Sequence, residues 1–255
     1  MRLTIKIGSN VLTRKDGSLD VTRMSALVDQ IAWLRSEGHE VILVSSGAVA
    51  SGRSELKHIQ HDLDSVDQRQ LFSAVGQAKL INRYFEMFRE YGIAVGQVLT
   101  TKENFFSDTE HRKNQENCMR VMLENNVLPI VNENDTVSVT ELMFTDNDEL
   151  SGLIARMTQS QMLIILSNID GIFTGDPADP ASRLICTVEP GKALDEYIQD
   201  KKSTAGRGGM QSKSNVATQT ASAGISVIIA NGKRDDILVK LMNDRANTPC
   251  TEFLC

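Results

Sequence analysis

Six short apolar segments rich in valine and isoleucine recur along the chain, and each is closed by a polar or glycine-containing stretch. Continuous apolar runs of this length are typical of strands that are buried on both faces, and such strands form mainly parallel sheets. The expected strands cover residues 3–8, 40–47, 93–99, 126–132, 161–168 and 225–232.

The stretches between these segments show helical spacing. Residues 20–37 carry apolar side chains three and four positions apart, and Gly38 follows as a stop signal. Residues 66–90 carry an apolar stripe of Leu71, Val75, Ile81, Phe85 and Phe88. Another expected helix contains Met119, Val121 and Leu123. The alternation of strands and helices predicts an α/β fold, a three-layer α/β/α sandwich with a mainly parallel central sheet.

The whole chain, residues 1–255, is predicted to form a single domain. Neither an internal repeat nor a low-complexity tract interrupts it, but "DGIFTGDPADPAS" (170–182) concentrates Asp, Gly and Pro as a loop signal. We therefore expect two lobes of one domain that divide near residue 170.

The overall charge narrows the possible partners. The formal net charge is -6, which argues against nucleic acid and anionic membranes because phosphate-backbone binding needs clustered Lys and Arg. The sequence contains no apolar run of about 18 residues, and its first residues read as a strand. A cytoplasmic protein without a membrane partner is the expected class.

Several expected strands end in small or polar residues, and open α/β sheets bind ligands at this edge. In "KIGSN", Lys6 lies in the strand and Gly8 follows it. Glycine lets the backbone approach an anion closely, and the lysine beside it supplies a positive charge. In "VSSGAVASG", Ser46 and Gly47 lead into an expected helix whose first N–H groups form an anion site. Both stretches could instead be tight structural turns, and the dinucleotide motif G-x-G-x-x-G is absent from the second.

Acidic and amide side chains are concentrated in "NENDTV" (132–137) and "FTDNDEL" (144–150). Such groups are costly to bury without partners, which leaves either a solvated loop or a site for a cationic ligand such as an amino acid's ammonium group. The spacing of an EF-hand calcium loop is not met. The side chains concerned are Asn132, Glu133, Asn134, Asp135, Asp146, Asn147, Asp148 and Glu149.

The segment "TAGRGGMQSKSNVA" (204–217) surrounds an arginine with glycines and then supplies a lysine. It is not a G-x-x-x-x-G-K-[ST] phosphate loop, because a serine rather than a glycine precedes Lys213. Lys213 instead follows Gly209 by about one helical turn. If a helix begins here, its glycine-capped N-terminus exposes N–H groups and Lys213 projects back toward them. This arrangement could bind phosphate without the Walker order.

Together these loops resemble the amino acid kinase family. "LSNIDGIFTGDPADP" (166–180) is similar to the family's nucleotide-side segment, and "KIGSN", "VSSGAVASG" and "GRGGMQSK" occur in the family's order over nearly the whole chain. Four segments resemble the members that phosphorylate glutamate and differ from acetylglutamate kinase and uridylate kinase. These are "NENDTV", "TDNDELSG", "AVGQAKL" (74–80) and "YGIAVGQVLTT" (91–101).

The resemblance implies ATP-dependent phosphorylation of the side-chain carboxylate of L-glutamate to glutamyl 5-phosphate, the first step of proline biosynthesis. It implies an amino-acid-substrate lobe over about residues 1–170 and a nucleotide lobe over about 171–255. Catalytic roles are implied for Lys6, Lys213 and Asp148, which would hold both lysines. The implied glutamate contacts are Ser46, Gly47, Asp135 and Asn147. The implied nucleotide contacts are Lys6, Gly8, Ser167, Asn168, Gly206, Arg207, Gly208, Gly209, Met210 and Lys213.

Further partners are implied by the same resemblance. Mg²⁺ would arrive with ATP, and no protein residue is assigned to it. Proline would be a feedback inhibitor, the labile product would be handed to glutamyl phosphate reductase, and the protein would form a homo-oligomer, with residues 66–90 as a candidate interface or simply core. We also expect a short form without a C-terminal PUA domain. Ser167-Asn168 departs from the family's common Thr-Asp, which puts the nucleotide contact there in doubt.

A carboxylate acceptor needs no general base at neutral pH because it is already ionised. This agrees with the absence of any histidine or cysteine constellation in the sequence. Two alternatives stay open: a kinase of the same family acting on another small acid, and a non-catalytic amino-acid sensor with the same fold.

Overall fold

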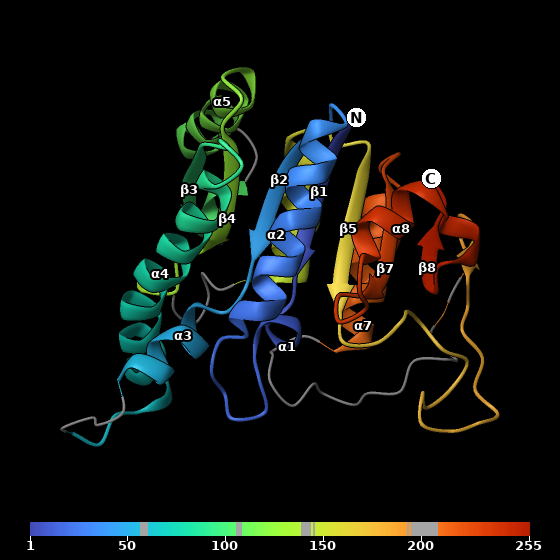
Figure 1. The fold of residues 1–255 in the computed structure, drawn as a ribbon, viewed down its shortest axis with the longest axis horizontal. Coiled ribbons are helices and arrows are strands. Elements are labelled where there is room, and N and C mark those ends of the chain that lie inside the picture. Colours follow the sequence, from blue (N-terminus) through green and yellow to red (C-terminus); the bar gives the residue numbers. More distant parts are fainter. Residues whose placement is uncertain (57–60, 106–108, 139–143, 145, 193, 195–208) are drawn as a thin grey trace.

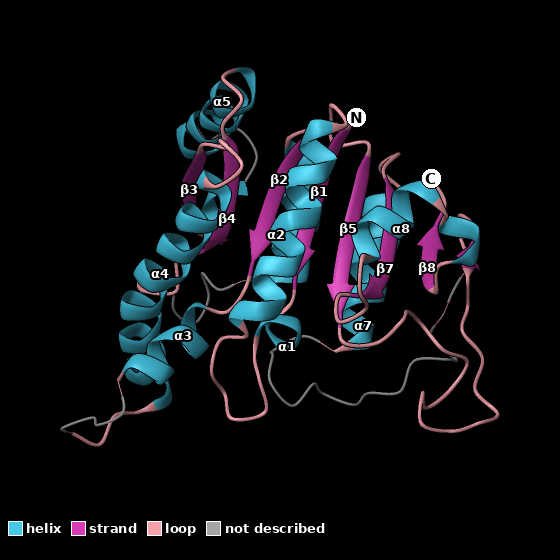
Figure 2. Ribbon diagram, in the orientation of Figure 1, coloured by secondary structure: helices cyan, strands magenta, loops and turns pink. Residues whose placement is uncertain are grey.

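One eight-stranded sheet organises the protein (Figures 1 and 2). The structure is a computed structural model that describes the chain except residues 57–60, 106–108, 139–143, 145, 193 and 195–208. All the strands expected from the apolar segments are present. They are β1 (Arg2–Ile7), β2 (Glu40–Ser45), β3 (Val95–Thr100), β4 (Leu128–Glu133), β5 (Met162–Ser167) and β7 (Ser226–Asn231). β6 (Thr187–Val188) and β8 (Cys250–Phe253) extend the sheet.

The strand order is β3-β4-β2-β1-β5-β7-β8-β6. All neighbours pair in parallel except β7 and β8, which are antiparallel. The central strand β1 pairs with β2 on one side and β5 on the other, so Lys6 lies level with Val44 and Ile165. The carboxyl ends of β1, β2, β4 and β5 therefore meet at one edge, where open α/β sheets bind ligands.

The predicted helices are also present. α2 (Val21–Ser36) begins after Asp20, whose side chain accepts a hydrogen bond from the Arg23 N–H, and it ends before Gly38. The remaining helices are α1 (Ser9–Leu12), α3 (Ala48–Glu55), α4 (Ser65–Arg89), α5 (Glu110–Glu124), α6 (Asn147–Met157), α7 (Met210–Ala221) and α8 (Ile237–Asn243). The described residues also include two short 3-10 helices, η1 (Lys102–Phe105) and η3 (Arg245–Asn247).

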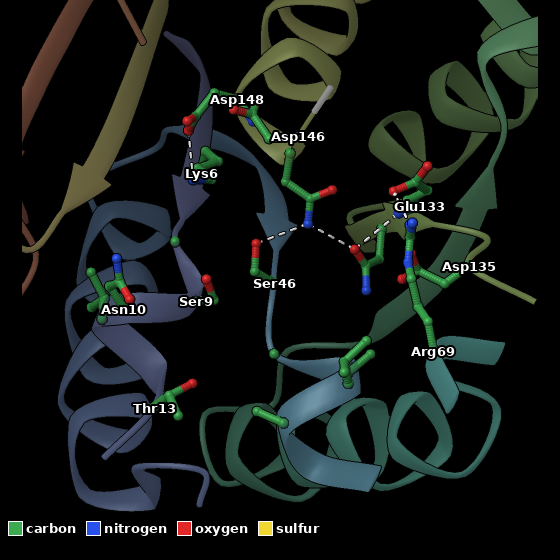
Figure 3. Close-up of a pocket in the computed structure, with 18 of the residues that line it drawn as sticks. Lys6, Ser9, Asn10, Thr13, Ser46, Arg69, Glu133, Asp135, Asp146 and Asp148 are labelled. Atoms are coloured by element: carbon green, nitrogen blue, oxygen red, sulfur yellow. Dashed lines mark hydrogen bonds and ion pairs between the residues drawn. The ribbon is translucent and has the colours of Figure 1, made fainter. Parts of the chain in front are cut away.

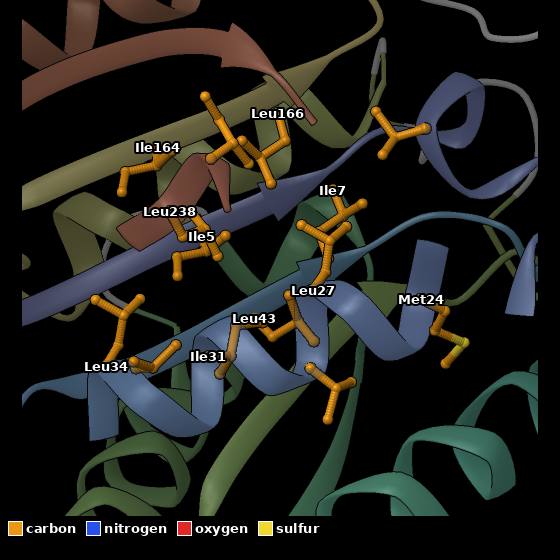
Figure 4. Packing of buried hydrophobic residues seen from close by; sticks show 14 of the residues in the cluster. Ile5, Ile7, Met24, Leu27, Ile31, Leu34, Leu43, Ile164, Leu166 and Leu238 are labelled. Atoms are coloured by element: carbon orange, nitrogen blue, oxygen red, sulfur yellow. The ribbon is translucent and has the colours of Figure 1, made fainter. Parts of the chain in front are cut away.

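The sheet is buried on both faces. Alternate side chains of β1 and β5, such as Ile5 and Ile164, pack against α2 and α8 in one cluster (Figure 4). The opposite face packs against α5, α6 and α7: Val44 clusters with Ile154, and the side chains of Ile165 and Ile229 cluster with residues of α7. This two-sided alternation is the three-layer sandwich that the continuous apolar runs predict. The division into lobes near residue 170 stays a prediction.

The expected stripe on α4 is only partly right. Phe88 is buried, but Phe85 is 49% exposed, and the buried face instead carries Phe72, Leu80 and Tyr84. The pattern misleads because that face also contains Ser73, Gly76 and Gln77, which pack or hydrogen-bond rather than contribute apolar area. None of the helices in the described part of the chain, α4 included, is long and apolar enough to cross a membrane.

Candidate active site

A pocket of about 610 Å³ lies at the carboxyl edge of β1, β2, β4 and β5. Its volume is in the range of small-molecule sites. The pocket brings together ten of the residues singled out from the sequence, which come from both halves of the chain. These are Lys6, Gly8, Ser46, Gly47, Asp135, Asn147, Asp148, Ser167, Asn168 and Lys213.

One end of the pocket holds two lysines on a single carboxylate, which we call the lysine triad (Lys6, Asp148 and Lys213). Lys6 Nζ lies 2.5 Å from Asp148 Oδ1, and Lys213 Nζ lies 2.9 Å from Asp148 Oδ2. The Asp148 side chain is 1% exposed, and those of the lysines are 6% and 12% exposed. Burial alone would raise the pKa of Asp148, but the two lysines together hold it below its ordinary value. Asp148 is therefore ionised and fixes both ammonium groups.

The triad draws on three elements distant in sequence. Lys6 is a β1 residue whose side chain points away from the face that carries Ile5 and Ile7, toward α6 (Figure 3). Asp148 lies in the first turn of α6, and Lys213 lies in the first turn of α7, after the cap residue Gly209. The helical register inferred from the sequence thus brings Lys213 back to the helix start.

A second link joins the same two helices. Asp146 caps α6 by accepting hydrogen bonds from the N–H groups of Asp148 and Glu149, at 2.9 and 3.0 Å. Its other oxygen accepts a 2.6 Å hydrogen bond from Ser212 Oγ on α7. Burial, and then the neighbouring charge of Asp148, raise the pKa of Asp146. Two adjacent residues of α7, Ser212 and Lys213, therefore bind the start of α6.

A chain of hydrogen-bonded amides crosses the middle of the pocket (Figure 3). Asn147 Nδ2 donates to Ser46 Oγ and to Asn132 Oδ1, both at 2.9 Å. Asn132 Nδ2 donates to Gln77 Oε1 on α4 at 2.8 Å. This chain fixes the orientation of Asn147 and ties the ends of β2 and β4 to α4 and α6.

The opposite end carries an arginine between two carboxylates, which we call the arginine triad (Arg69, Glu133 and Asp135). Arg69 Nε donates to Asp135 Oδ1 at 2.9 Å, and Nη2 donates to Glu133 Oε2 at 3.0 Å and to Asp135 Oδ1. Glu133 Oε1 accepts further hydrogen bonds from Ser138 Oγ at 2.8 Å and the Phe144 N–H at 3.0 Å. The side chains of Glu133 and Asp135 are 2% and 10% exposed.

Two glycines, one in the turn after β2 and one in α4, set the position at which α3 begins. Gly47 caps α3 with φ of 110°, a left-handed conformation that other L-residues rarely adopt. Where α3 crosses α4, a Cβ on Gly76 would lie 1.8 Å from the carbonyl oxygen of Ala48. The close crossing therefore fixes the start of α3, directly after Ser46.

The nucleotide side is only partly described. A Cβ on Gly8 would lie 3.2 Å from both the Leu166 carbonyl oxygen and Lys6 Nζ. A glycine at this position therefore leaves the space beside the Lys6 ammonium group open. Met210 is half-buried and packs against the cluster between the sheet and α7, and its predicted nucleotide contact stays a prediction. Gly206, Arg207 and Gly208 lie outside the described residues.

Arg69, Arg53 and Gln77 are pocket or network residues that the sequence reasoning missed. A signal for Arg69 was available: its helical neighbours three and four positions away are Val66, Phe72 and two serines, so it has no acidic partner within α4. A helical arginine whose neighbours at this spacing are apolar residues and serines indicates a partner on another element.

Among the described residues no group of three or more His, Cys, Asp and Glu side chains could enclose a metal ion. Asp148 is engaged by two lysines, and Asp146 caps a helix and accepts from Ser212. This donor set does not fit an all-protein metal cage. It fits an ion that arrives with phosphate groups and keeps several of its waters, as Mg²⁺ does.

Comparison with known proteins identifies the class that this fold and pocket define. The model of the amino acid kinase family matches residues 1–231, and the chain belongs to this family. The chain is 70% identical over 253 residues to "Glutamate 5-kinase" of Bacteroides thetaiotaomicron, covering 99% of this chain and 70% of that protein. It is 46% identical to "Glutamate 5-kinase" of Chlorobaculum tepidum, over 93% of this chain and 65% of that protein.

Two further comparisons concern a longer relative and a solved structure. "Delta-1-pyrroline-5-carboxylate synthase" of Mesembryanthemum crystallinum is 37% identical over 258 residues, which cover 95% of this chain and 36% of that protein. Among solved structures, an isopentenyl phosphate kinase aligns with a TM-score of 0.70 at 16% identity, over 99% of this chain and 100% of that one. At this identity the likeness shows the fold alone.

Proposed function

We propose that this protein transfers the γ-phosphoryl group of ATP to the side-chain carboxylate of L-glutamate, which gives glutamyl 5-phosphate in the first step of proline biosynthesis. The observation that carries the proposal is the polarity of the pocket, with the lysine triad at one end and the arginine triad at the other. An amino acid with an anionic side chain fits this polarity, and the 70% identical relative bears the name of this activity.

In the proposed complex the substrate's ammonium group faces Asp135, while Ser46, Gly47 and Asn147 contact the middle of the molecule. Its side-chain carboxylate then points toward the lysine triad. Asn147 suits this position because its amide is already oriented by Ser46 and Asn132, so little reorganisation accompanies binding.

The chemical step is an in-line displacement. A carboxylate oxygen of glutamate forms a bond to the γ-phosphorus while the bond to the β,γ-bridging oxygen breaks, and ADP leaves with the electron pair. An anion must approach an anion, so catalysis consists mainly of positioning and charge stabilisation. Lys6 and Lys213 would flank the transferred group, with Gly8 leaving room beside Lys6 Nζ and the α7 N-terminus supplying backbone N–H groups.

Mg²⁺ bound to the nucleotide would neutralise part of the phosphate charge, and it would take few ligands from the described residues. The lysines do not need a change of protonation during the step. Asp148 maintains their geometry, since each of its oxygens binds one lysine.

An acyl phosphate hydrolyses readily, so rapid transfer to the next enzyme is advantageous. A hand-off to glutamyl phosphate reductase is supported by the synthase from Mesembryanthemum, of which this chain matches only 36%. Homo-oligomer formation and inhibition by proline, which shares the ammonium and carboxylate of an amino acid, are further parts of the proposal.

The direct test is trapping of the acyl phosphate with hydroxylamine, together with measurement of ADP release. Glutamate, aspartate, N-acetylglutamate and UMP should be compared at equal MgATP. We expect glutamate-dependent ADP release matched by an equal amount of glutamyl hydroxamate. A higher kcat/KM with another acceptor would make that acceptor the substrate in place of glutamate. Nucleotide binding without turnover of any acceptor would favour a non-catalytic sensor.

A further inference from the structure

Arg69 is one of the charged pocket residues that the proposed reaction does not use. It belongs to the second turn of α4, and its guanidinium reaches across to the segment that follows β4. Figure 3 shows the side chain extending from α4 to Glu133 and Asp135 at the edge of the pocket. The contact joins residues 64 and 66 positions apart in the sequence, so it is a feature of the tertiary structure.

We propose that Arg69 is a positioning residue for the amino-acid substrate, which orients Asp135 to receive the substrate's ammonium group. This inference rests on the proposed function, because it concerns how glutamate is recognised. Arg69 grips Asp135 Oδ1 with both Nε and Nη2, and Nη2 at the same time holds Glu133 Oε2. A planar fork can fix two carboxylates in one orientation, which a single ammonium group cannot do.

The charge count explains why an arginine is needed here. Glu133 and Asp135 are both largely buried, and two ionised carboxylates side by side repel each other. Arg69 offsets one negative charge and leaves the arginine triad with a net charge of about -1. A cation of the substrate beside Asp135 is favoured by this charge, whereas an anionic group at this position is opposed by it.

Anchoring of the loop alone does not require Arg69. Gln70, the next residue of α4, donates a 2.7 Å hydrogen bond to the Thr136 carbonyl oxygen of the same loop. Gln77 accepts from Asn132 at the start of the loop, and Glu133 is also held by Ser138. What Arg69 adds is the orientation and charge balance of Asp135, and this distinction can be tested.

The test compares Arg69→Met, Arg69→Lys and Gln70→Ala with the unmodified full chain. The methionine variant keeps the apolar stem without the fork, the lysine variant keeps the charge without the fork, and the Gln70 variant removes an anchor without a charge. KM for glutamate, KM for ATP and kcat are measured by hydroxamate formation and ADP release. Thermal unfolding checks that each variant folds.

We expect the KM for glutamate to rise about 30-fold or more in Arg69→Met, the size typical of truncating one partner of a buried charge pair. The KM for ATP should stay within about twofold, because the interaction concerns substrate binding. The KM for glutamate of Arg69→Lys should lie between those of Arg69→Met and the unmodified chain. Gln70→Ala should leave the KM for glutamate nearly unchanged.

Two results would overturn the inference while leaving the proposed function intact. One is an unchanged KM for glutamate in Arg69→Met. The other is an equal rise in Arg69→Met and Gln70→Ala, which would reduce Arg69 to a loop anchor. If the unmodified chain forms no glutamyl hydroxamate, the proposed function itself fails, and the inference fails with it.

Discussion

The two ends of the pocket share one design with opposite signs. In the lysine triad a buried carboxylate, Asp148, lies between Lys6 and Lys213. In the arginine triad a guanidinium, Arg69, lies between two buried carboxylates, one of which is Asp135. With two cations and one anion the first carries a net charge of about +1, and with the reverse count the second carries about -1.

This difference shows how a pocket can recognise a zwitterion without leaving bare charges in its walls. Burying an isolated charge is costly, whereas a triad pairs most of its charge internally and leaves one unit for the ligand. The central member of each triad fixes the geometry of the outer two. Removing a central residue should therefore do more damage than removing an outer one.

Asp148→Asn should have the largest effect. It leaves two poorly exposed lysines without a counter-charge, a change that typically costs about 3–5 kcal/mol of stability. Activity should fall at least as far as in either lysine variant, because both lysines lose their shared partner. Urea unfolding and hydroxamate assays measure the two effects. The control is Asp170→Asn, which removes the partner of the exposed Arg234 in an ion pair outside the pocket. Its expected loss of stability is smaller, because exposed ion pairs contribute little.

The same variant tests the pKa of Asp148. Burial would raise this pKa, but the two lysines hold it below its ordinary value, so the folded state favours the ionised form. The stabilisation is fully present above the pKa of the unfolded state, about 4, and is lost as the pH falls through the lower folded-state pKa. Unfolding of the unmodified protein should thus depend more steeply on acid pH than that of Asp148→Asn. Parallel pH curves would contradict the assignment.

Lys213→Ala should lower kcat by about 10²–10³, the usual result of removing one preorganised charge from a transition state. The KM for glutamate should change little, because in the proposed complex the ammonium group lies at the other end of the pocket. Lys79→Ala, which removes an exposed lysine paired with Glu55, is a suitable control. Near-normal turnover of Lys213→Ala would exclude the lysine triad from phosphoryl transfer.

Gly76→Ala should disturb the proposed glutamate end of the pocket more than the phosphoryl end. The added methyl would come within 1.8 Å of the Ala48 carbonyl oxygen and 2.4 Å of the Gly52 nitrogen, so α3 must move. Overpacking of this kind costs about 1–3 kcal/mol, and it should shift Ser46 and raise the KM for glutamate more than that for ATP. The control is Ala78→Gly at an exposed position of α4. An equal rise in both KM values would show that the two ends are not separable.

The lysine triad was within reach of sequence reasoning, and so were the two carboxylates of the arginine triad, but Arg69 was not. Lys6 and Lys213 stand beside glycines at the ends of expected elements, and parallel strands bring such ends to one edge. Their attachment to Asp148 was implied by family resemblance. Arg69 lies inside a helix whose apolar stripe was predicted only in part, and its partners are more than 60 residues away. Local periodicity carries no information about such a contact.

The strands were predicted closely for a physical reason. A strand buried on both faces is apolar at every position, so its bounds are visible without knowledge of its partners. α4 differs because its buried face mixes Phe72 and Leu80 with Gly76 and Gln77, which serve helix crossing and hydrogen bonding. The residues that were hardest to predict are therefore those of α4 that join it to α3 and to the proposed glutamate end of the pocket.

Ser212→Ala should have the smallest effect, and it asks whether the two ends communicate. Ser212 Oγ donates to Asp146, which caps α6 directly before Asn147, while the next residue of α7 binds Asp148. Loss of one hydrogen bond to a carboxylate costs about 1.5–3 kcal/mol, of which a water molecule can restore a part. We expect kcat to fall severalfold and the KM for glutamate to rise with it, because α6 carries both Asn147 and Asp148.

Ser212→Thr retains the hydroxyl and should behave like the unmodified protein, which makes it the matched control. The alanine variant separates two views of the pocket. If α7 positions only the phosphoryl end, kcat falls while the KM for glutamate stays constant. If the start of α6 is a rigid unit held by α7, both parameters change together, since displacement of the Asp146 cap moves Asn147 and Asp148 as one body. A constant KM would therefore show that the opposite charges at the two ends are positioned independently.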